Sequence, residues 1–283
     1  MGSTSHAMKY SKFTCSFEKT RNTYKEWSKL FNSPKNGPFA IMDIGCGSGQ
    51  VLMEVLEPMF PENYSELVGI DIDPTMIEYC KNLKLDSRIS FEQMDIATKK
   101  LPDKFKNRFN LLCSFFCLMY VTDLRRALRN SRDMLKLNGE LLYLFLHRIN
   151  PVWECYKDLS RQEEWKPYTQ EFADFIPRYS GEDRELELQA DFTESGLEII
   201  KYEFQSDYSI CTTRRNILNL FETMNSLYHR IPEDKKQNFR LDYVISLSNY
   251  VGVDFLKEES LEEEIEMFFP TVVVHARNTQ TAK

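Results

Sequence analysis

The chain has 283 residues and a formal net charge of −7, from 36 lysines and arginines against 43 aspartates and glutamates. This acidic balance gives no overall field that would attract nucleic acid or an anionic membrane surface, so we expect neither as a partner. No apolar run reaches the roughly 18 residues that a membrane-spanning helix needs. A hydrophobic share of 42% and a charged share of 28% are ordinary for a soluble globular protein.

Seven cysteines are scattered along the chain. An odd, unclustered set indicates free thiols in a reducing, cytoplasmic compartment rather than a disulfide framework. No neighbouring histidine completes a zinc set, so we expect no metal. Residues 1–8 have the composition of a vector-derived tag.

The expected elements begin with an amphipathic helix at 9–31, followed by a loop rich in proline and glycine. From residue 39 onwards strands and helices alternate, which predicts a doubly wound α/β fold with a mostly parallel sheet. Strands are expected at 39–44, 67–71, 89–94, 109–116 and 140–146, and helices at 49–57, 74–83 and 123–135.

The second half of the chain is expected to be mostly helical. A long helical stretch begins at Pro151, and a further helix at 184–195 ends at Gly196. Residues 197–204 and 267–276 are predicted strands. Two helices between these strands, at 213–229 and 233–251, are expected to form a lid around 205–258. We therefore divide the chain into the tag, a covering helix within 9–37, and a main domain at 38–283 that carries the lid.

The most informative motif is a strand that runs into a glycine-rich bend at residues 40–50. Glycine has no Cβ, so such a bend lets the main chain approach a ligand closely. The third glycine comes one residue earlier than in a dinucleotide fingerprint, and Asp43 before the bend can accept hydrogen bonds from an ammonium group. This combination favours S-adenosylmethionine (SAM) over a nicotinamide cofactor. The bend residues expected at the cofactor are Gly45, Cys46, Gly47 and Gly49.

Further acids follow the next strands. Asp71 comes 22 residues after Gly49, where an acid in a βαβ unit binds the ribose hydroxyls. Asp95 ends the third predicted strand and is expected to accept from the adenine amino group. The faces of the adenine ring would be covered by Ile72 and Ile96. Ser114, near the end of the fourth strand, completes the predicted cofactor set.

These motifs resemble those of class I SAM-dependent methyltransferases: residues 43–49, 68–71 and 94–96 carry the match. More narrowly, residues 144–147, 175–179 and 274–278 are similar to segments of arthropod juvenile hormone acid methyltransferases. The resemblance implies a seven-stranded sheet and transfer of a methyl group from SAM to the carboxylate of a small lipophilic acid, such as a juvenile hormone acid or farnesoic acid.

At two positions the chain departs from that family. Glu18 stands where the family has a glutamine that helps hold the substrate carboxylate, and Met119–Tyr120 replaces a His–Trp pair. Tyr120 can donate a hydrogen bond in place of the indole. An ionised Glu18, however, repels a carboxylate.

Two acceptor hypotheses follow. Either Tyr120 orients a carboxylate while Glu18 turns away or is protonated, or Glu18 holds an amine or takes its proton. The second is supported by a likeness of residues 118–123 to histamine N-methyltransferases. A third hypothesis is a SAM-binding protein without catalysis. Glu18 and Tyr120 are the candidate catalytic residues, and the expected substrate-binding residues are Phe17, Glu18, Phe115, Met119, Tyr120, His147 and Trp153.

Overall fold

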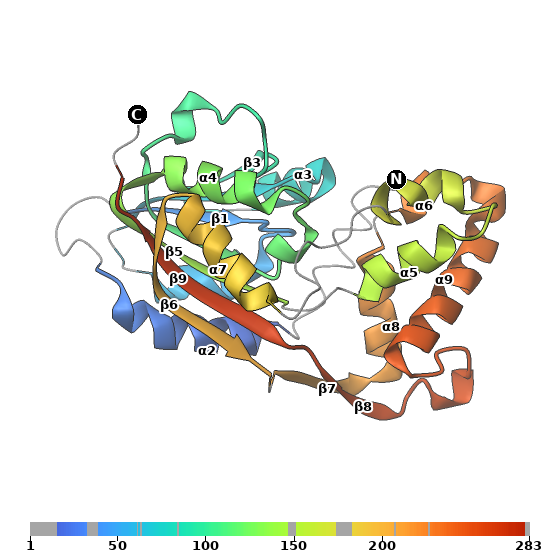
Figure 1. Ribbon diagram of the computed structural model, residues 1–283. Helices are drawn as coiled ribbons and strands as arrows, with labels where there is room; N and C mark the ends of the chain where they lie inside the picture. The colour runs from blue at the N-terminus through green and yellow to red at the C-terminus, as the bar shows by residue number, and fades with distance from the viewer. Residues whose placement is uncertain are drawn as a thin grey trace. The chain divides into compact units, whose positions relative to one another are not determined.

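The structure is a computed structural model that describes residues 16–32, 39–60, 62, 64–83, 85–146, 151–173, 183–206, 208–225 and 227–280 (Figure 1). It divides the chain into two compact units. The first comprises Met1–His147, Gly181–Ser206 and Pro270–Lys283, and the second comprises Arg148–Ser180 and Asp207–Phe269. The tag and the first residues of the expected N-terminal helix lie outside the described residues.

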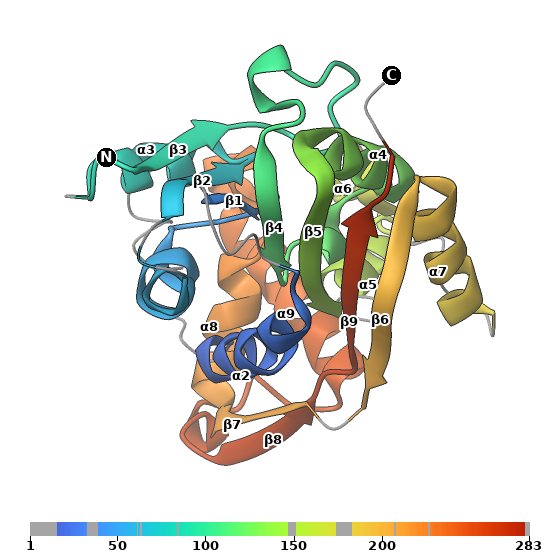
Figure 2. The same ribbon diagram turned by 90° about the vertical axis from the view of Figure 1, so that its left-hand side faces the viewer.

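The first unit is built on a seven-stranded sheet in the order β3-β2-β1-β4-β5-β9-β6 (Figure 2). Strands β1 to β5 are parallel, whereas β9 is antiparallel to both β5 and β6. This arrangement confirms the expected doubly wound, mostly parallel α/β fold. The strands are β1 (Phe39–Ile44), β2 (Tyr64–Asp71), β3 (Ile89–Gln93), β4 (Phe109–Phe115), β5 (Leu135–Leu146), β6 (Leu197–Gln205) and β9 (Thr271–Asn278).

Helices cover both faces of this sheet. On one face, Leu142 and Leu144 of β5 belong to a core cluster that includes Trp27 of α2 (Phe17–Trp27). Residues of η2 (Val51–Leu56) and α3 (Pro74–Lys81) belong to the same cluster. On the other face Tyr143 donates to Ser131 of α4 (Leu124–Met134) and its ring lies near α7 (Arg184–Glu194). The alternation of side chains along β5 thus separates the two helical layers.

Local sequence signals explain where these helices begin and end. The side chain of Asp73 accepts from the amide of Thr75 at the start of α3, and Asp123 accepts from the amide of Arg126 at the start of α4. Helix α7 ends before Gly196, whose φ of 84° is easily adopted by glycine alone. Short helical turns lie at η1 (Ser28–Leu30), η3 (Glu57–Met59), η4 (Asp103–Phe105) and η5 (Leu118–Tyr120).

The second unit is mainly helical and has a core of its own. The Trp165 ring meets Phe239 edge on at 5.3 Å, and its Nε1 donates to Asp242 at 2.7 Å. Tyr156 donates to Asn225 at 2.9 Å. The elements are α5 (Pro151–Leu159), α6 (Lys166–Ala173), β7 (Ser209–Thr213), α8 (Arg214–Thr223), η6 (Tyr228–Arg230), η7 (Glu233–Lys235), α9 (Lys236–Val251), η8 (Glu258–Ser260) and β8 (Glu264–Phe268).

Several expected boundaries differ from those in the structure; the helix expected at 213–229, for example, ends at Thr223. The strand expected at 140–146 begins at Leu135, because Asn138, with a φ of 62°, and Gly139 form an irregularity within the strand rather than a turn before it. The strand expected at 267–276 is two strands, β8 and β9, which end and begin on either side of Phe269 and Pro270 and belong to different units. Helices α5 and α6 also belong with residues 207–269, so this unit includes more of the chain than the expected lid.

Among the described residues, no helix is both long enough and apolar enough to cross a membrane. The six cysteines in the described part of the chain are all free thiols. In the same residues no group of three or more potential metal-ligating side chains is found.

Candidate functional site

The glycine bend lies at the carboxyl end of β1, where it turns back against β2. The amides of Gly45 and Cys46 both donate to the carbonyl of Ile70, at 2.8 and 3.0 Å. Gly45 has a φ of 74°, and a Cβ at this position would lie 2.2 Å from Cys117 Sγ. Gly45 is therefore required by the backbone conformation and by the packing of Cys117, a residue that the sequence did not assign to the site.

Asp71, at the end of β2, is oriented by the bend. One carboxylate oxygen accepts from the amide of Gly47 at 2.8 Å, and the other accepts from the amide of Asp73 at 2.9 Å. Burial raises the pKa of Asp71, and these two hydrogen bonds oppose the rise. A carboxylate has about four acceptor positions, so Asp71 can still accept from two hydroxyl groups of a ligand.

Asp43, at the end of β1, is a buried acid next to another acid. Its exposed fraction is 3%. Burial, and then the negative charge of Asp71, raise the pKa of Asp43 from 3.8 to about 7. Neither a hydrogen bond nor an ion pair to its carboxylate is found within the described residues. Two acids held together in this way are stabilised by a cationic ligand.

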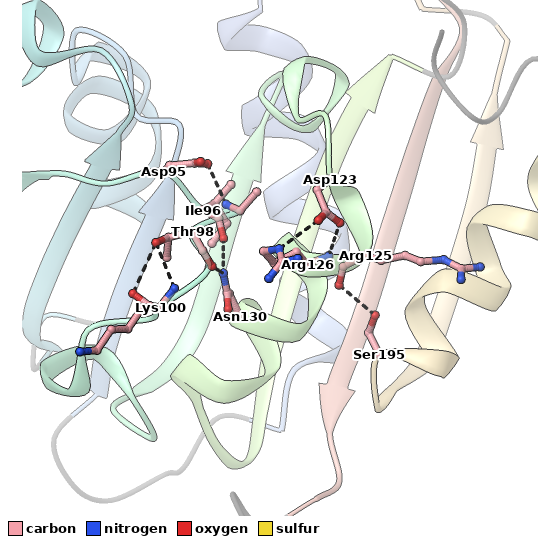
Figure 3. Close-up of polar contacts among 10 residues, drawn as sticks. Asp95, Ile96, Thr98, Lys100, Asp123, Arg125, Arg126, Asn130 and Ser195 are labelled. Carbon is pink, nitrogen blue, oxygen red and sulfur yellow. Dashed lines mark hydrogen bonds and ion pairs between the residues drawn. The ribbon is translucent and has the colours of Figure 1, made fainter. Parts of the chain in front are cut away.

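Asp95 follows β3 on a loop that is held in place by α4. The Asp95 side chain is exposed and accepts from the amide of Ala97 at 2.8 Å. The side-chain amide of Asn130 donates to the carbonyls of Ile96 and Thr98, at 2.7 and 2.9 Å (Figure 3). Asn130 therefore fixes this loop. The sequence offered no signal for that role, because the contact joins residues more than thirty positions apart.

The negative charges of the three predicted acids all raise the pKa of one thiol, that of Cys117. Burial, then Asp71 and Asp43, and more weakly Asp95, raise the pKa of Cys117 far above its usual value. The three strand-end acids thus all lie near Cys117, which packs beside the glycine bend, and their contacts with a cofactor stay predictions. Cys117 directly precedes the turn η5 that carries Tyr120, and the amide of Tyr120 donates to the carbonyl of Cys117 at 2.9 Å.

The donor set fits SAM on chemical grounds. SAM carries a positive sulfonium and an ammonium group, and the bend presents the buried Asp43 beside the half-buried Asp71, with no cationic partner to either acid in the described part of the chain. Asp71 is oriented by main-chain amides and keeps acceptor capacity for the ribose. Asp43, Asp71 and the bend would hold the cofactor.

The other residues predicted at the cofactor differ from one another in burial and in hydrogen bonding. The hydroxyl of Ser114 is buried and donates to the carbonyl of Ile44 at 2.9 Å, so it ties β4 to β1. Ile72 is 64% exposed, whereas Ile96 is buried. The buried thiol of Cys46 lies 3.8 Å from the carbonyl of Gly47. Their contacts with the cofactor stay predictions.

Helix α2 places Glu18 at the same edge of the sheet. Lys19 Nζ donates to Gln205 Oε1 at 2.5 Å. Gln205, the last residue of β6, pairs with Thr271, and Thr271 pairs with Leu146, the last residue of β5. The first turn of α2 therefore lies level with the end of β5, at the edge where β1 and β2 also end. Glu18 is exposed in this turn.

The remaining candidates for the acceptor side lie in several segments. Phe17 begins α2 and is buried, and Phe115 is buried at the end of β4. Met119 and Tyr120 are half-buried in η5, just beyond β4. Their roles towards an acceptor stay predictions.

Two predicted substrate-binding residues are not placed with this group. His147 lies outside the described residues. Trp153 is in α5 of the second unit, where its ring meets Tyr156 edge on at 5.8 Å.

Comparisons with known proteins identify the class. Residues 41–139 match the family model described as a methyltransferase domain. The fold is shared with the cyclase SpnF (TM-score 0.56, 17% identity, 94% of this chain and 82% of that chain). It is also shared with the YcgJ protein from Bacillus subtilis (TM-score 0.53, 15% identity, 92% and 99%). The chain therefore carries a methyltransferase domain on a Rossmann-like fold; it is a SAM-dependent methyltransferase, and SAM is its cofactor.

Over a longer stretch the chain is similar to two curated insect enzymes. It is 29% identical over 259 residues to the juvenile hormone acid O-methyltransferase of Drosophila melanogaster, covering 90% of this chain and 85% of that protein. It is also 29% identical over 205 residues to the enzyme of the same name from Bombyx mori, covering 72% of each protein. Both similarities span more of the chain than the stretch that the family model matches.

Proposed function

We propose that this enzyme transfers the methyl group of SAM to the carboxylate of a small lipophilic acid of the juvenile hormone acid or farnesoic acid type. The observation that carries the proposal is the similarity to the Drosophila enzyme over 90% of the chain. The family-model match covers only residues 41–139, the stretch that contains the predicted cofactor residues. The wider similarity therefore also includes parts of the chain outside the stretch that carries the predicted cofactor residues.

When bound, SAM supplies an electrophilic methyl carbon on a positively charged sulfur. The residues of the chain have to hold the acceptor in line with that carbon and exclude water. A carboxylate is ionised at neutral pH and needs no general base, so in this reaction Tyr120 orients the acceptor by donating a hydrogen bond. The buried Phe115 and Phe17 contribute the apolar surface that a lipophilic acid requires.

The second candidate function is methylation of a small amine. It is favoured by the exposed Glu18, at the edge of the sheet where β1 and β2 end. An amine must lose a proton before it can accept a methyl group. A carboxylate at position 18 can hold the ammonium form and take that proton. Towards a carboxylate acceptor, the same side chain is repulsive.

The test is methyl transfer from labelled SAM to paired panels of lipophilic acids and biogenic amines, measured for the wild type and Glu18→Gln. If the acceptor is an acid, Glu18→Gln keeps or raises turnover, because a repulsive charge is removed. If the acceptor is an amine, the variant loses turnover while SAM still binds. Glu78→Gln removes an exposed carboxylate from α3 and serves as the matched control. Turnover on amines alone would contradict the proposal.

A further inference from the structure

A buried acid contacts the chain just after the N-terminal helix. Glu140 of β5 is 3% exposed. One of its carboxylate oxygens accepts from the main-chain amide of Asn32 at 2.8 Å. The other lies 3.3 Å from His275 Nε2 and accepts from the Arg277 guanidinium at 3.2 Å. The ring of Phe31 also meets the His275 ring edge on, at 5.1 Å.

This cluster keeps Glu140 charged. Burial by itself raises the pKa of Glu140, but the hydrogen bond and charge of His275, the Asn32 amide and Arg277 together bring it below the usual value. The Asn32 amide therefore donates to an ionised acceptor. Such charge-assisted hydrogen bonds are roughly twice as strong as neutral ones.

Three contacts join α2 and the residues that follow it to the strands of the sheet, and the Asn32 contact is the last of them along the chain. At the start of α2, Lys19 binds Gln205, level with the carboxyl end of β5. Further along, Lys201 of β6 lies 4.0 Å over the Trp27 ring and 3.6 Å from Glu26. The Asn32 contact follows at Glu140, six residues back from the end of β5. Helix α2 thus runs antiparallel to β5, and the chain that follows its far end is bound at Glu140.

We propose that Glu140, held by His275 and Arg277, is a positioning residue that sets where Glu18 stands at the acceptor side of the site. This inference rests on the proposed function, which assigns Glu18 to that side. An α-helix behaves as a rigid rod with a rise of about 1.5 Å per residue, so release of its far end lets its first turn shift. A displacement of about 1 Å can cost on the order of 100-fold in rate.

Asn32 allows the contact to be removed without altering the buried cluster. Its side chain is exposed, and only its amide binds Glu140. Asn32→Pro deletes this donor, and Phe31, with φ −70° and ψ 136°, already has the extended conformation that precedes a proline. Asn32→Ala keeps the amide and is the matched control.

Glu140→Ala removes the acceptor from the other side. Its control is Asp191→Ala, which also removes a buried acid bound to an arginine, but on α7 at the opposite face of the sheet. Hydrogen exchange of the amides in residues 17–32, the KM for the acceptor and the dissociation constant for SAM are measured for all four variants.

Asn32→Pro and Glu140→Ala are expected to speed exchange across 17–27 and to raise the acceptor KM about 10-fold, with SAM affinity changed less than about 2-fold. Neither control is expected to do so. Unchanged exchange in Asn32→Pro, faster exchange without a change in acceptor KM, or equal effects in the controls would each overturn the inference. If the wild type methylates neither acids nor amines, the proposed function fails, while hydrogen exchange still reports on the contact.

Discussion

Asp43 offers a substitution with opposite effects on stability and on cofactor binding. Replacing Asp43 by asparagine keeps the size of the side chain and removes its charge. In the ligand-free protein this charge is buried beside Asp71 and is unfavourable. In the complex, the same charge attracts a cationic cofactor. We therefore expect Asp43→Asn to stabilise the ligand-free protein at alkaline pH and to weaken SAM binding.

The magnitude follows from the pKa of Asp43, which is about 7 in the folded protein against an ordinary value of 3.8. Because the folded state holds the proton more tightly, this carboxyl lowers stability progressively as the pH rises from about 4 to about 7. Each pKa unit corresponds to about 1.4 kcal/mol, so the full effect is on the order of 4 kcal/mol above pH 7. Because the site relaxes partly around this charge, the free energy of unfolding of Asp43→Asn is expected to exceed that of the wild type by about 2–4 kcal/mol at pH 8.

The same pKa predicts how SAM affinity depends on pH. Above pH 7 Asp43 is mostly ionised and binds a cation, whereas at pH 6 about one tenth of it is ionised. Affinity should therefore fall about 10-fold between pH 8 and pH 6, and Asp43→Asn should bind weakly at both values. The measurements are urea unfolding of the ligand-free proteins at pH 5 and pH 8, and calorimetry with SAM at pH 6 and pH 8.

Two results would refute this reasoning. One is an Asp43→Asn protein that unfolds at a lower urea concentration than the wild type at pH 8. The other is a wild-type SAM affinity that differs by less than about 2-fold between pH 6 and pH 8. Either would mean that Asp43 does not hold an unfavourable charge in the ligand-free site.

Two further substitutions test the rest of the site. Asp71→Ala should weaken SAM binding about 10-fold or more, because the ribose hydroxyls lose a charged acceptor; an unchanged dissociation constant in calorimetry would contradict this placement. Asn130→Ala removes the donor to the Ile96 and Thr98 carbonyls and should lower the free energy of unfolding by about 1–3 kcal/mol. An Asn130→Ala protein with the wild-type urea midpoint would show that the loop does not depend on this amide.

Much of the first unit could be predicted because its signals are local. The buried run of β1, the capping residue before α4 and the glycine after α7 each act within a few residues, and the structure has all three. The boundary errors have a physical cause as well. Asn138 and Gly139 read as a turn, but pairing of β5 with β4 accommodates them as an irregularity within a strand.

The sequence by itself determined the class of cofactor. A strand-end acid, a glycine bend and further acids at the next strand ends are a pattern along the chain, and parallel strands bring such positions to one edge. That is why Asp43 and Asp71 could be named together before their burial and pKa were known.

Only the tertiary structure decided how the site is supported. Cys117 fills the space beside Gly45, Asn130 holds the loop after Asp95, and Glu140 binds the amide of Asn32 from a strand more than a hundred residues away. None of these contacts has a sequence period or a short motif. They arise because folding buries polar groups, and each buried group needs a partner wherever the fold happens to place one.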